Sequence, residues 1–200
     1  MQTMTAQYDT LVERMLPSEG ARAWMRDILL AIAGTALITL SAKINIPFYP
    51  VPMTMQTLAV LALAMCYGLR LGTATLALYI AEGAAGLPVF AGTPEKGIGL
   101  AYMMGSTGGY ILGFLLAAML VGYLAERGFD RSPLKAAIAM LAGNIVIYVP
   151  GLLWLGAVVG WDKPVLSFGL YPFVLGDLFK IALGAALLPG IWALLKRRNG

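Results

Sequence analysis

The chain has 200 residues, of which 60% are hydrophobic and only 12% are charged, and its formal net charge is +4. Soluble domains average roughly 45–50% apolar and about 25% charged residues, so the composition excludes an ordinary soluble domain and predicts a chain that is solvated by lipid. The single cysteine, Cys66, and the lack of histidine exclude disulfide frameworks, Cys/His metal sites and any mechanism that needs a histidine base.

The first 24 residues are expected to form a polar, cytoplasmic lead-in. Charged side chains recur through residues 9–27, and the lack of an apolar core among them argues against a cleavable signal peptide. The first membrane helix would then act as the insertion signal.

Long apolar runs predict six membrane helices in chain order. They are expected at residues 28–46, 54–67, 71–85, 106–126, 133–160 and 171–196. The second and third are short for full spans, and Gly68, Leu69 and Arg70 are expected to form a tight turn between them. The predicted fold is therefore all-α, a polytopic membrane protein with one domain, whose residues 25–197 form a six-helix bundle.

Two stretches between these helices are expected to be irregular. Residues 46–52 contain three prolines, which a helix interior does not tolerate, so an extended outer loop is expected there. This loop is a candidate lid over the outer mouth of the bundle, and a static turn is the alternative. A glycine-rich loop is expected from residue 86 to about residue 105. Within the fifth helix, Pro150 is expected to produce a kink.

The basic residues predict the orientation of the chain, because cytoplasmic segments carry an excess of Lys and Arg. With both termini on the cytoplasmic side, ten basic residues fall in cytoplasmic segments and three, Lys43, Lys96 and Lys163, fall in outer segments. Basic residues are scattered at helix ends, which is typical of membrane topology and not of a nucleic-acid interface.

Three ionisable residues lie inside predicted spans, where such groups are costly and commonly functional. Glu82, Asp177 and Lys180 all fall in the outer half of the bilayer in this topology. Asp177 and Lys180 are spaced i, i+3 and therefore share a helix face. They form either a self-neutralising pair that holds helices together or one wall of a polar ligand pocket. The pocket would gain further polar groups from Gln56, Tyr79, Asn144 and Tyr148.

The glycine-rich segment 105–110 has some features of a phosphate-binding loop but lacks the Gly-Lys-[Ser/Thr] end of a P-loop. Capping and close packing of the following helix explain it. Since the rest of the sequence carries no nucleotide motif, the chain alone is not expected to hydrolyse ATP.

The first helix carries a ridge of small residues, Ala31, Thr35 and Thr39. Such ridges let helix backbones approach closely. The ridge either packs within the bundle or docks against another subunit.

Several segments together resemble the BioY family, the biotin-specific substrate-binding components of energy-coupling-factor transporters. The resemblance covers nearly the whole chain after about residue 22, and it rests on segments 42–47, 50–57, 86–92, 106–110 and 176–180 in this order and spacing.

The resemblance implies a multi-pass protein of the cell (inner) membrane that binds biotin at its outer side. It also implies a transmembrane coupling protein and a pair of cytoplasmic ATP-binding-cassette ATPases that supply the energy. In the family the biotin site includes an aspartate and a lysine, which match Asp177 and Lys180. Docking of the coupling protein is implied at the small-residue ridge Ala31, Thr35 and Thr39.

The chemistry of biotin is consistent with the residues of the predicted pocket. An ionised Asp177 could accept hydrogen bonds from the two ureido N–H groups, and Asn144, Gln56 or Lys180 could donate to the ureido carbonyl. The fused rings would need aromatic walls, for which Tyr79, Phe90, Tyr148 and Phe173 are candidates. Nearer to water, Lys96 or Lys43 could pair with the valerate carboxylate. Neither a cofactor nor a metal is expected.

Other functions are left open at this stage. The chain could be the substrate-binding component for another vitamin or a stand-alone facilitator. A membrane enzyme that uses Asp177, Glu82 or a serine is a further alternative, but the sequence offers no recognisable pair of nucleophile and base.

Overall fold

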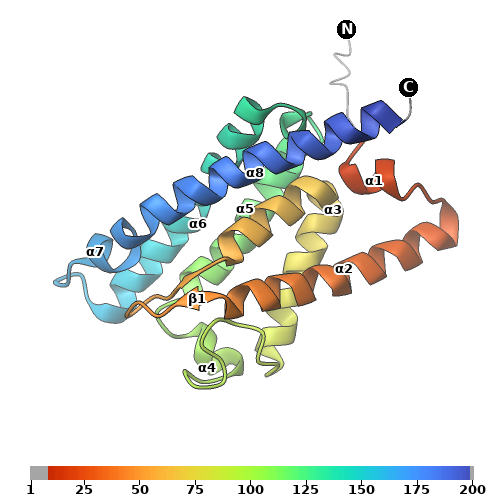
Figure 1. The fold of residues 1–200 in the computed structure, drawn as a ribbon. Coiled ribbons are helices and arrows are strands. Elements are labelled where there is room, and N and C mark those ends of the chain that lie inside the picture. Colours follow the sequence, from red (N-terminus) through yellow and green to blue (C-terminus); the bar gives the residue numbers. More distant parts are fainter. Residues whose placement is uncertain (1–8, 199–200) are drawn as a thin grey trace, which may run out of the picture.

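The computed structural model describes residues 9–198, which form a bundle of long helices with short connecting elements (Figure 1). The elements in chain order are α1 (Leu11–Met15), α2 (Gly20–Lys43), β1 (Asn45–Ile46), β2 (Met53–Thr54), α3 (Gln56–Ala84), α4 (Gly99–Met103), α5 (Gly108–Ala125), η1 (Phe129–Arg131), α6 (Pro133–Val159), α7 (Val165–Gly169) and α8 (Tyr171–Arg198). The described part of the chain begins and ends at the same end of the bundle (Figure 1).

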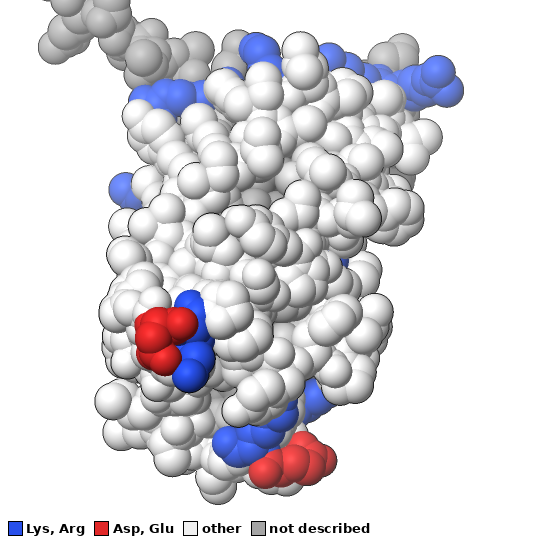
Figure 2. All heavy atoms as spheres, turned by 90° about the vertical axis from the view of Figure 1, so that its left-hand side faces the viewer, with Lys and Arg blue, Asp and Glu red and all other residues white. Residues whose placement is uncertain are grey.

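Within residues 9–198, five stretches are helical, long and apolar enough to cross a membrane: α2, α3, α5, α6 and the stretch from Val165 to Arg197. The prediction of a polytopic helical membrane protein is therefore confirmed. Many large apolar side chains remain exposed on these helices, as expected where the solvent is lipid. On the face drawn in Figure 2, basic side chains gather at the upper end, charges of both signs lie toward the lower end, and the broad band between them carries few.

The stretch α3 contains the second and third predicted helices. At Gly68 its backbone leaves the helical conformation, with φ 75° and ψ −172°, so that α3 consists of two helical segments joined by a sharp bend. This φ value lies in the left-handed region, which glycine adopts without the cost that a Cβ would impose. Gly68 lies in the tight turn that the sequence predicts.

Close packing of α5 against its neighbours holds the bundle together. A Cβ atom at Gly113 would lie 2.7 Å from the carbonyl oxygen of Ile147 in α6. One at Gly122 would lie 2.6 Å from the carbonyl carbon of Gly68. These glycines therefore let the α5 backbone touch both α6 and the bend of α3, as small residues do in membrane bundles.

Several boundaries differ from those predicted. The first long helix runs from Gly20 to Lys43, whereas 28–46 was expected, because charged residues in its first two turns extend beyond its apolar part. Residues 45–54 form a small hairpin in which Asn45 pairs with Thr54 and Ile46 with Met53. The glycine-rich loop contains the short helix α4. Pro150 lies inside α6, where the sequence places it.

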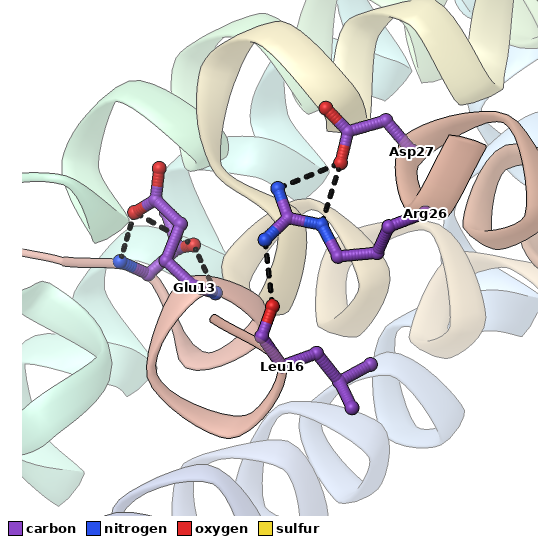
Figure 3. A network of polar contacts seen from close by, with 5 residues as sticks. Glu13, Leu16, Arg26 and Asp27 are labelled. Carbon is purple, nitrogen blue, oxygen red and sulfur yellow. Dashed lines mark hydrogen bonds and ion pairs between the residues drawn. The ribbon is translucent and has the colours of Figure 1, made fainter. Parts of the chain in front are cut away.

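The short helix α1 is fastened to the start of α2 by polar contacts (Figure 3). Thr10 and Glu13 form a capping box at the beginning of α1. At its other end, Arg26 donates from Nη1 to the Leu16 carbonyl at 2.7 Å and from Nε to Asp27 Oδ1 at 2.9 Å. These contacts hold α1 against the first part of α2.

Candidate ligand-binding site

A buried ion pair on α8 forms the centre of the candidate site. Lys180 donates from Nζ to Asp177 Oδ1 at 2.9 Å, and each side chain is 7% exposed. The spacing i, i+3 places both on one face of α8, as the sequence predicts. Breaking such a pair by removing one partner is strongly destabilising, because the other charge stays buried without compensation.

Two other helices contribute hydroxyl groups to this pair. Thr57 of α3 accepts a hydrogen bond from Lys180 Nζ at 2.9 Å and lies 3.3 Å from Asp177 Oδ1, to which it donates. Tyr148 of α6 donates its hydroxyl to Asp177 Oδ2. Both carboxylate oxygens of Asp177 are therefore engaged, by groups that come from three helices.

These four polar residues face a cavity with an empty volume of about 560 Å³, which includes the space open to solvent at its mouth. Its other walls are mainly apolar and aromatic, and they include Tyr102, Tyr110, Phe114, Ile147 and Phe173. A mostly apolar cavity with a few placed polar groups is typical of small-molecule sites.

Hydrogen bonds from their hydroxyl groups hold two tyrosines of the cavity wall in place. Tyr110 donates to the Gly169 carbonyl at 2.9 Å, and Tyr102 donates to the Ala91 carbonyl. Burial raises the pKa of the Tyr102 phenol above its usual range, so this part of the wall stays uncharged. The two rings thus present fixed, uncharged faces to the cavity.

The proline-rich stretch covers one side of the cavity. Val51, Pro52, Met53 and Thr54 line it. Ser106 donates to the Pro50 carbonyl at 2.9 Å, and the Phe48 ring meets Phe173 edge to face with 6.1 Å between centroids. The stretch therefore rests on both the start of α5 and the start of α8.

Of the predicted binding residues, Asp177, Lys180 and Tyr148 line this cavity. Three others form an adjoining cluster that lies outside its lining. Gln56 donates from Nε2 to the Tyr79 hydroxyl at 2.7 Å, and Tyr79 in turn donates to the Val89 carbonyl at 2.9 Å. The third, Phe90, stacks on the cavity residue Tyr102 with 5.3 Å between centroids, so the cluster supports the cavity wall from behind.

Asn144 and Lys96 also lie outside the cavity lining. Asn144 is 4% exposed on α6, and its Oδ1 atom has no hydrogen-bond partner among the described residues. Lys96 is exposed in the loop before α4. Lys43, at the end of α2, donates to the carbonyl oxygens of Phe90 and Thr93 at 2.9 and 3.0 Å and so holds this loop. Within residues 9–198, Lys180 is the only basic side chain that lines the cavity.

Sequence reasoning missed Thr57, Tyr102 and Tyr110 as cavity residues. Thr57 directly follows Gln56 in the segment 50–57, but a threonine in a span gives little signal, since it usually bonds to its own helix. Tyr110 directly follows the glycine pair 108–109, where only capping and packing were considered.

The small-residue ridge on α2 faces the bundle. Thr35 is 3% exposed and donates to the Glu82 carboxylate of α3 at 3.1 Å, and Thr39 donates to the Thr35 carbonyl at 2.8 Å. Glu82 is thus bonded to α2 and is absent from the cavity lining. Ala31 and Thr39 are half-buried and therefore more accessible than Thr35, which is buried.

Replacing Thr57 by valine tests whether its hydroxyl matters to the site. We expect ligand affinity to fall by about 0.5–1.5 kcal/mol, because the Asp177–Lys180 pair loses the hydroxyl that bridges it. Thr73→Val is the matched control, since the Thr73 hydroxyl is buried without a hydrogen-bond partner in the described structure. Equal affinities of the two variants by isothermal titration would remove Thr57 from the site.

Comparisons with known proteins show which family the chain belongs to. The model of the BioY family matches residues 8–197. A biotin transporter BioY of Thermotoga maritima is 39% identical over 163 residues, which cover 82% of this chain and 94% of the relative. A probable biotin transporter BioY of Rickettsia prowazekii is 31% identical over 180 residues, which cover 88% of each chain.

The fold also matches a solved structure, the S-component for biotin from an ECF-type ABC transporter. The TM-score is 0.73, the sequence identity is 24%, and the match covers 88% of this chain and 95% of that one. This similarity supports the helical membrane fold. Together with the family match over nearly the whole sequence, it confirms the resemblance inferred from the motifs: the chain belongs to the BioY family.

Proposed function

We propose that this chain binds biotin in the cavity between α3, α5, α6 and α8, and that it serves as the substrate-binding component of a biotin uptake system. The observation that carries the proposal is the buried Asp177–Lys180 pair at the polar end of an aromatic-walled cavity. The chain's curated relatives are transporters, so its role is transport and not catalysis.

In this proposal the polar end of the cavity receives the ureido ring. Asp177 accepts hydrogen bonds from ureido N–H groups, and Lys180 donates to the ureido carbonyl. Tyr148 and Thr57 donate to Asp177, and ligand N–H groups would replace them as donors. This exchange conserves the hydrogen bonds of a buried carboxylate, which keeps the cost of desolvation low.

The remaining predicted residues take supporting roles. Gln56, Tyr79 and Phe90 hold the wall that Tyr102 presents. Asn144, with its unpaired acceptor, is proposed to meet a ureido N–H group if α6 turns slightly on binding. Lys96, on the exposed loop near the outer mouth, is proposed to pair with the valerate carboxylate.

We further propose six membrane-spanning segments, with α3 counted as two because of its bend at Gly68. Both termini are assigned to the cytoplasm of a cell whose inner membrane holds the protein. The gathering of basic side chains at one end of the bundle supports this orientation (Figure 2). Residues 1–24 are assigned to a cytoplasmic lead-in, although its first eight residues lie outside the described part of the chain.

The energy for uptake is assigned to separate proteins, a transmembrane coupling protein and a pair of ATP-binding-cassette ATPases. Two observations support this assignment: the sequence has no nucleotide-binding motif, and the structurally similar protein is a component of an ECF-type ABC transporter. Docking of the coupling protein is proposed on α2, where Ala31 and Thr39 remain half-buried.

Identification of the small molecule that co-purifies with the protein tests the proposed function directly. Mass spectrometry is expected to find biotin, and added biotin is expected to bind the purified chain at micromolar concentration or below. Absence of biotin binding would defeat the proposal. Uptake into liposomes by this chain alone would indicate a facilitator, whereas dependence on added coupling protein and ATPases would support the assigned partners.

The proline-rich stretch is proposed to act as a lid. Phe48 of this stretch meets Phe173 of α8 edge to face. In a Cys66→Ser background, Phe48→Cys and Phe173→Cys joined by a short bismaleimide should slow biotin association and dissociation together. Stopped-flow measurement before and after cross-linking checks this result. Unchanged rates would show that the stretch is a static turn.

A further inference from the structure

Another pocket lies where residues from near the two ends of the described chain meet Arg131 of η1, and it shares no lining residue with the candidate cavity. Its empty volume is about 490 Å³, including space open to solvent. It is lined by Asp9, Arg14, Arg131, Trp192, Leu195 and Lys196. Three of these six residues are basic and one is acidic, so the pocket has an excess of positive charge.

The floor of this pocket holds Arg131 in a fixed orientation. The Arg131 guanidinium lies 4.3 Å from the centroid of the Trp192 ring, and its Nη2 donates to the Asp9 carbonyl at 3.1 Å. Trp192 is itself 5% exposed and donates its indole N–H to the buried Asp130 carboxyl. A guanidinium held in this way keeps its positive charge at a fixed place in the pocket, since arginine stays charged at any physiological pH.

In the proposed topology, the part of α8 that lines the pocket lies at the level of the lipid headgroups. On the same helix, Leu187 and Leu194 are 54% and 66% exposed, which marks a lipid-facing surface. Lys196 follows Leu194 by two residues, so the change from lipid-facing to basic surface occurs within one turn. Basic pockets at this level of a membrane protein suit anionic lipid headgroups.

We propose that this pocket binds the phosphate group of an anionic phospholipid. Arg131 supplies a positive charge that is held in place, Arg14 and Lys196 supply exposed positive charge, and Leu195 borders the apolar part of the lipid. The negative charge of Asp9 offsets one of the three positive charges, which disfavours the binding of a second phosphate. A lipid bound here would join three parts of the chain: the segment around α1, η1 and the end of α8.

The test uses the full-length protein with defined lipids. The purified chain is incubated with phosphatidylglycerol or phosphatidylcholine, and retained lipid is measured by native mass spectrometry. We expect wild-type protein to retain phosphatidylglycerol preferentially. Arg14→Gln with Lys196→Gln should lower this retention about tenfold or more, because each basic side chain near an anionic lipid contributes about 1 kcal/mol.

Arg22→Gln with Arg70→Gln is the matched control, since both residues are exposed and neither lines the pocket. This control variant loses the same two positive charges as the test variant, and it should retain phosphatidylglycerol as the wild type does. A similar loss in both double variants, or equal retention of the two lipids, would overturn the proposal. Displacement of the lipid by millimolar inorganic phosphate would instead identify a free-anion site. Unchanged biotin binding and an unchanged melting temperature show that the variants fold. Asp9→Asn removes the opposing negative charge and should therefore raise the retention of phosphatidylglycerol.

Discussion

Asp177→Asn is expected to weaken biotin binding by roughly 1–3 kcal/mol, which corresponds to a loss of about five- to 150-fold. The Asp177 side chain is 7% exposed, and its carboxylate is the proposed acceptor for the ureido N–H groups. An asparagine keeps the shape of the side chain but has one acceptor oxygen and a donor where the second oxygen was. One ligand N–H group would then meet another donor in a buried site. Isothermal titration with biotin measures the effect.

The same substitution also leaves Lys180 without its charged partner, and this effect has to be separated from the loss of a ligand contact. Removing one partner of a buried pair costs about 3–5 kcal/mol. The double variant Asp177→Asn with Lys180→Met removes both charges, so its thermal stability should recover toward the wild type while its biotin affinity stays low. Glu82→Gln is the control carboxylate, because Glu82 bonds to Thr35 and does not line the cavity. Wild-type affinity of the Asp177→Asn protein would remove Asp177 from the site.

Gly113→Ala is expected to lower the free energy of unfolding by about 1–3 kcal/mol, as overpacking of a well-packed interior does. The added Cβ would lie 2.7 Å from the carbonyl oxygen and 2.8 Å from the Cα atom of Ile147. Both are backbone atoms, which a rotamer change cannot move, so α5 and α6 must separate. These helices carry Tyr110 and Tyr148, and biotin affinity should therefore fall with stability.

Gly190→Ala is the matched control for this prediction. A Cβ at Gly190, which lies inside α8, would meet no atom within 4 Å. Alanine there should be neutral or slightly stabilising, because alanine favours a helix over glycine by about 1 kcal/mol. Thermal unfolding of both variants in the same detergent gives the comparison. Equal melting temperatures would contradict the proposed close contact between α5 and α6.

The sequence predicted the long helices well, but it predicted fewer of the contacts between side chains. The bend at Gly68 was predictable because a glycine and an arginine interrupt an apolar stretch too long for one span. The pairing of Asp177 with Lys180 was predictable because residues three apart always share a helix face. By contrast, the hairpin of residues 45–54 and helix α4 lack periodic patterns and are held by contacts with distant segments, such as that from Ser106 to Pro50.

Gln56 and Thr57 illustrate where sequence reasoning stops. They are adjacent in α3, and the sequence favours Gln56 as the binding residue because its amide carries more hydrogen-bonding groups. In the structure Gln56 bonds to Tyr79, whereas Thr57 bonds to Asp177 and Lys180. Neighbouring residues of a helix point about 100° apart, so the rotation of α3 about its axis decides which of them faces the cavity.

Three features follow from the sequence alone: the chain is solvated by lipid, its helices alternate with short connections, and one aspartate and one lysine share a face of the last helix. Composition and local spacing are enough for these conclusions. Placing a charge or an unpaired backbone group in lipid is costly for every residue, whichever distant residues lie beside it. Which helices complete the site depends instead on how they pack. Packing brings Thr57 and Tyr148 to Asp177 and places the cluster of Gln56, Tyr79 and Phe90 behind the cavity wall. Those contacts depend on the bend of α3 and on how closely α5 and α6 approach, and both are set by packing between residues far apart in the chain.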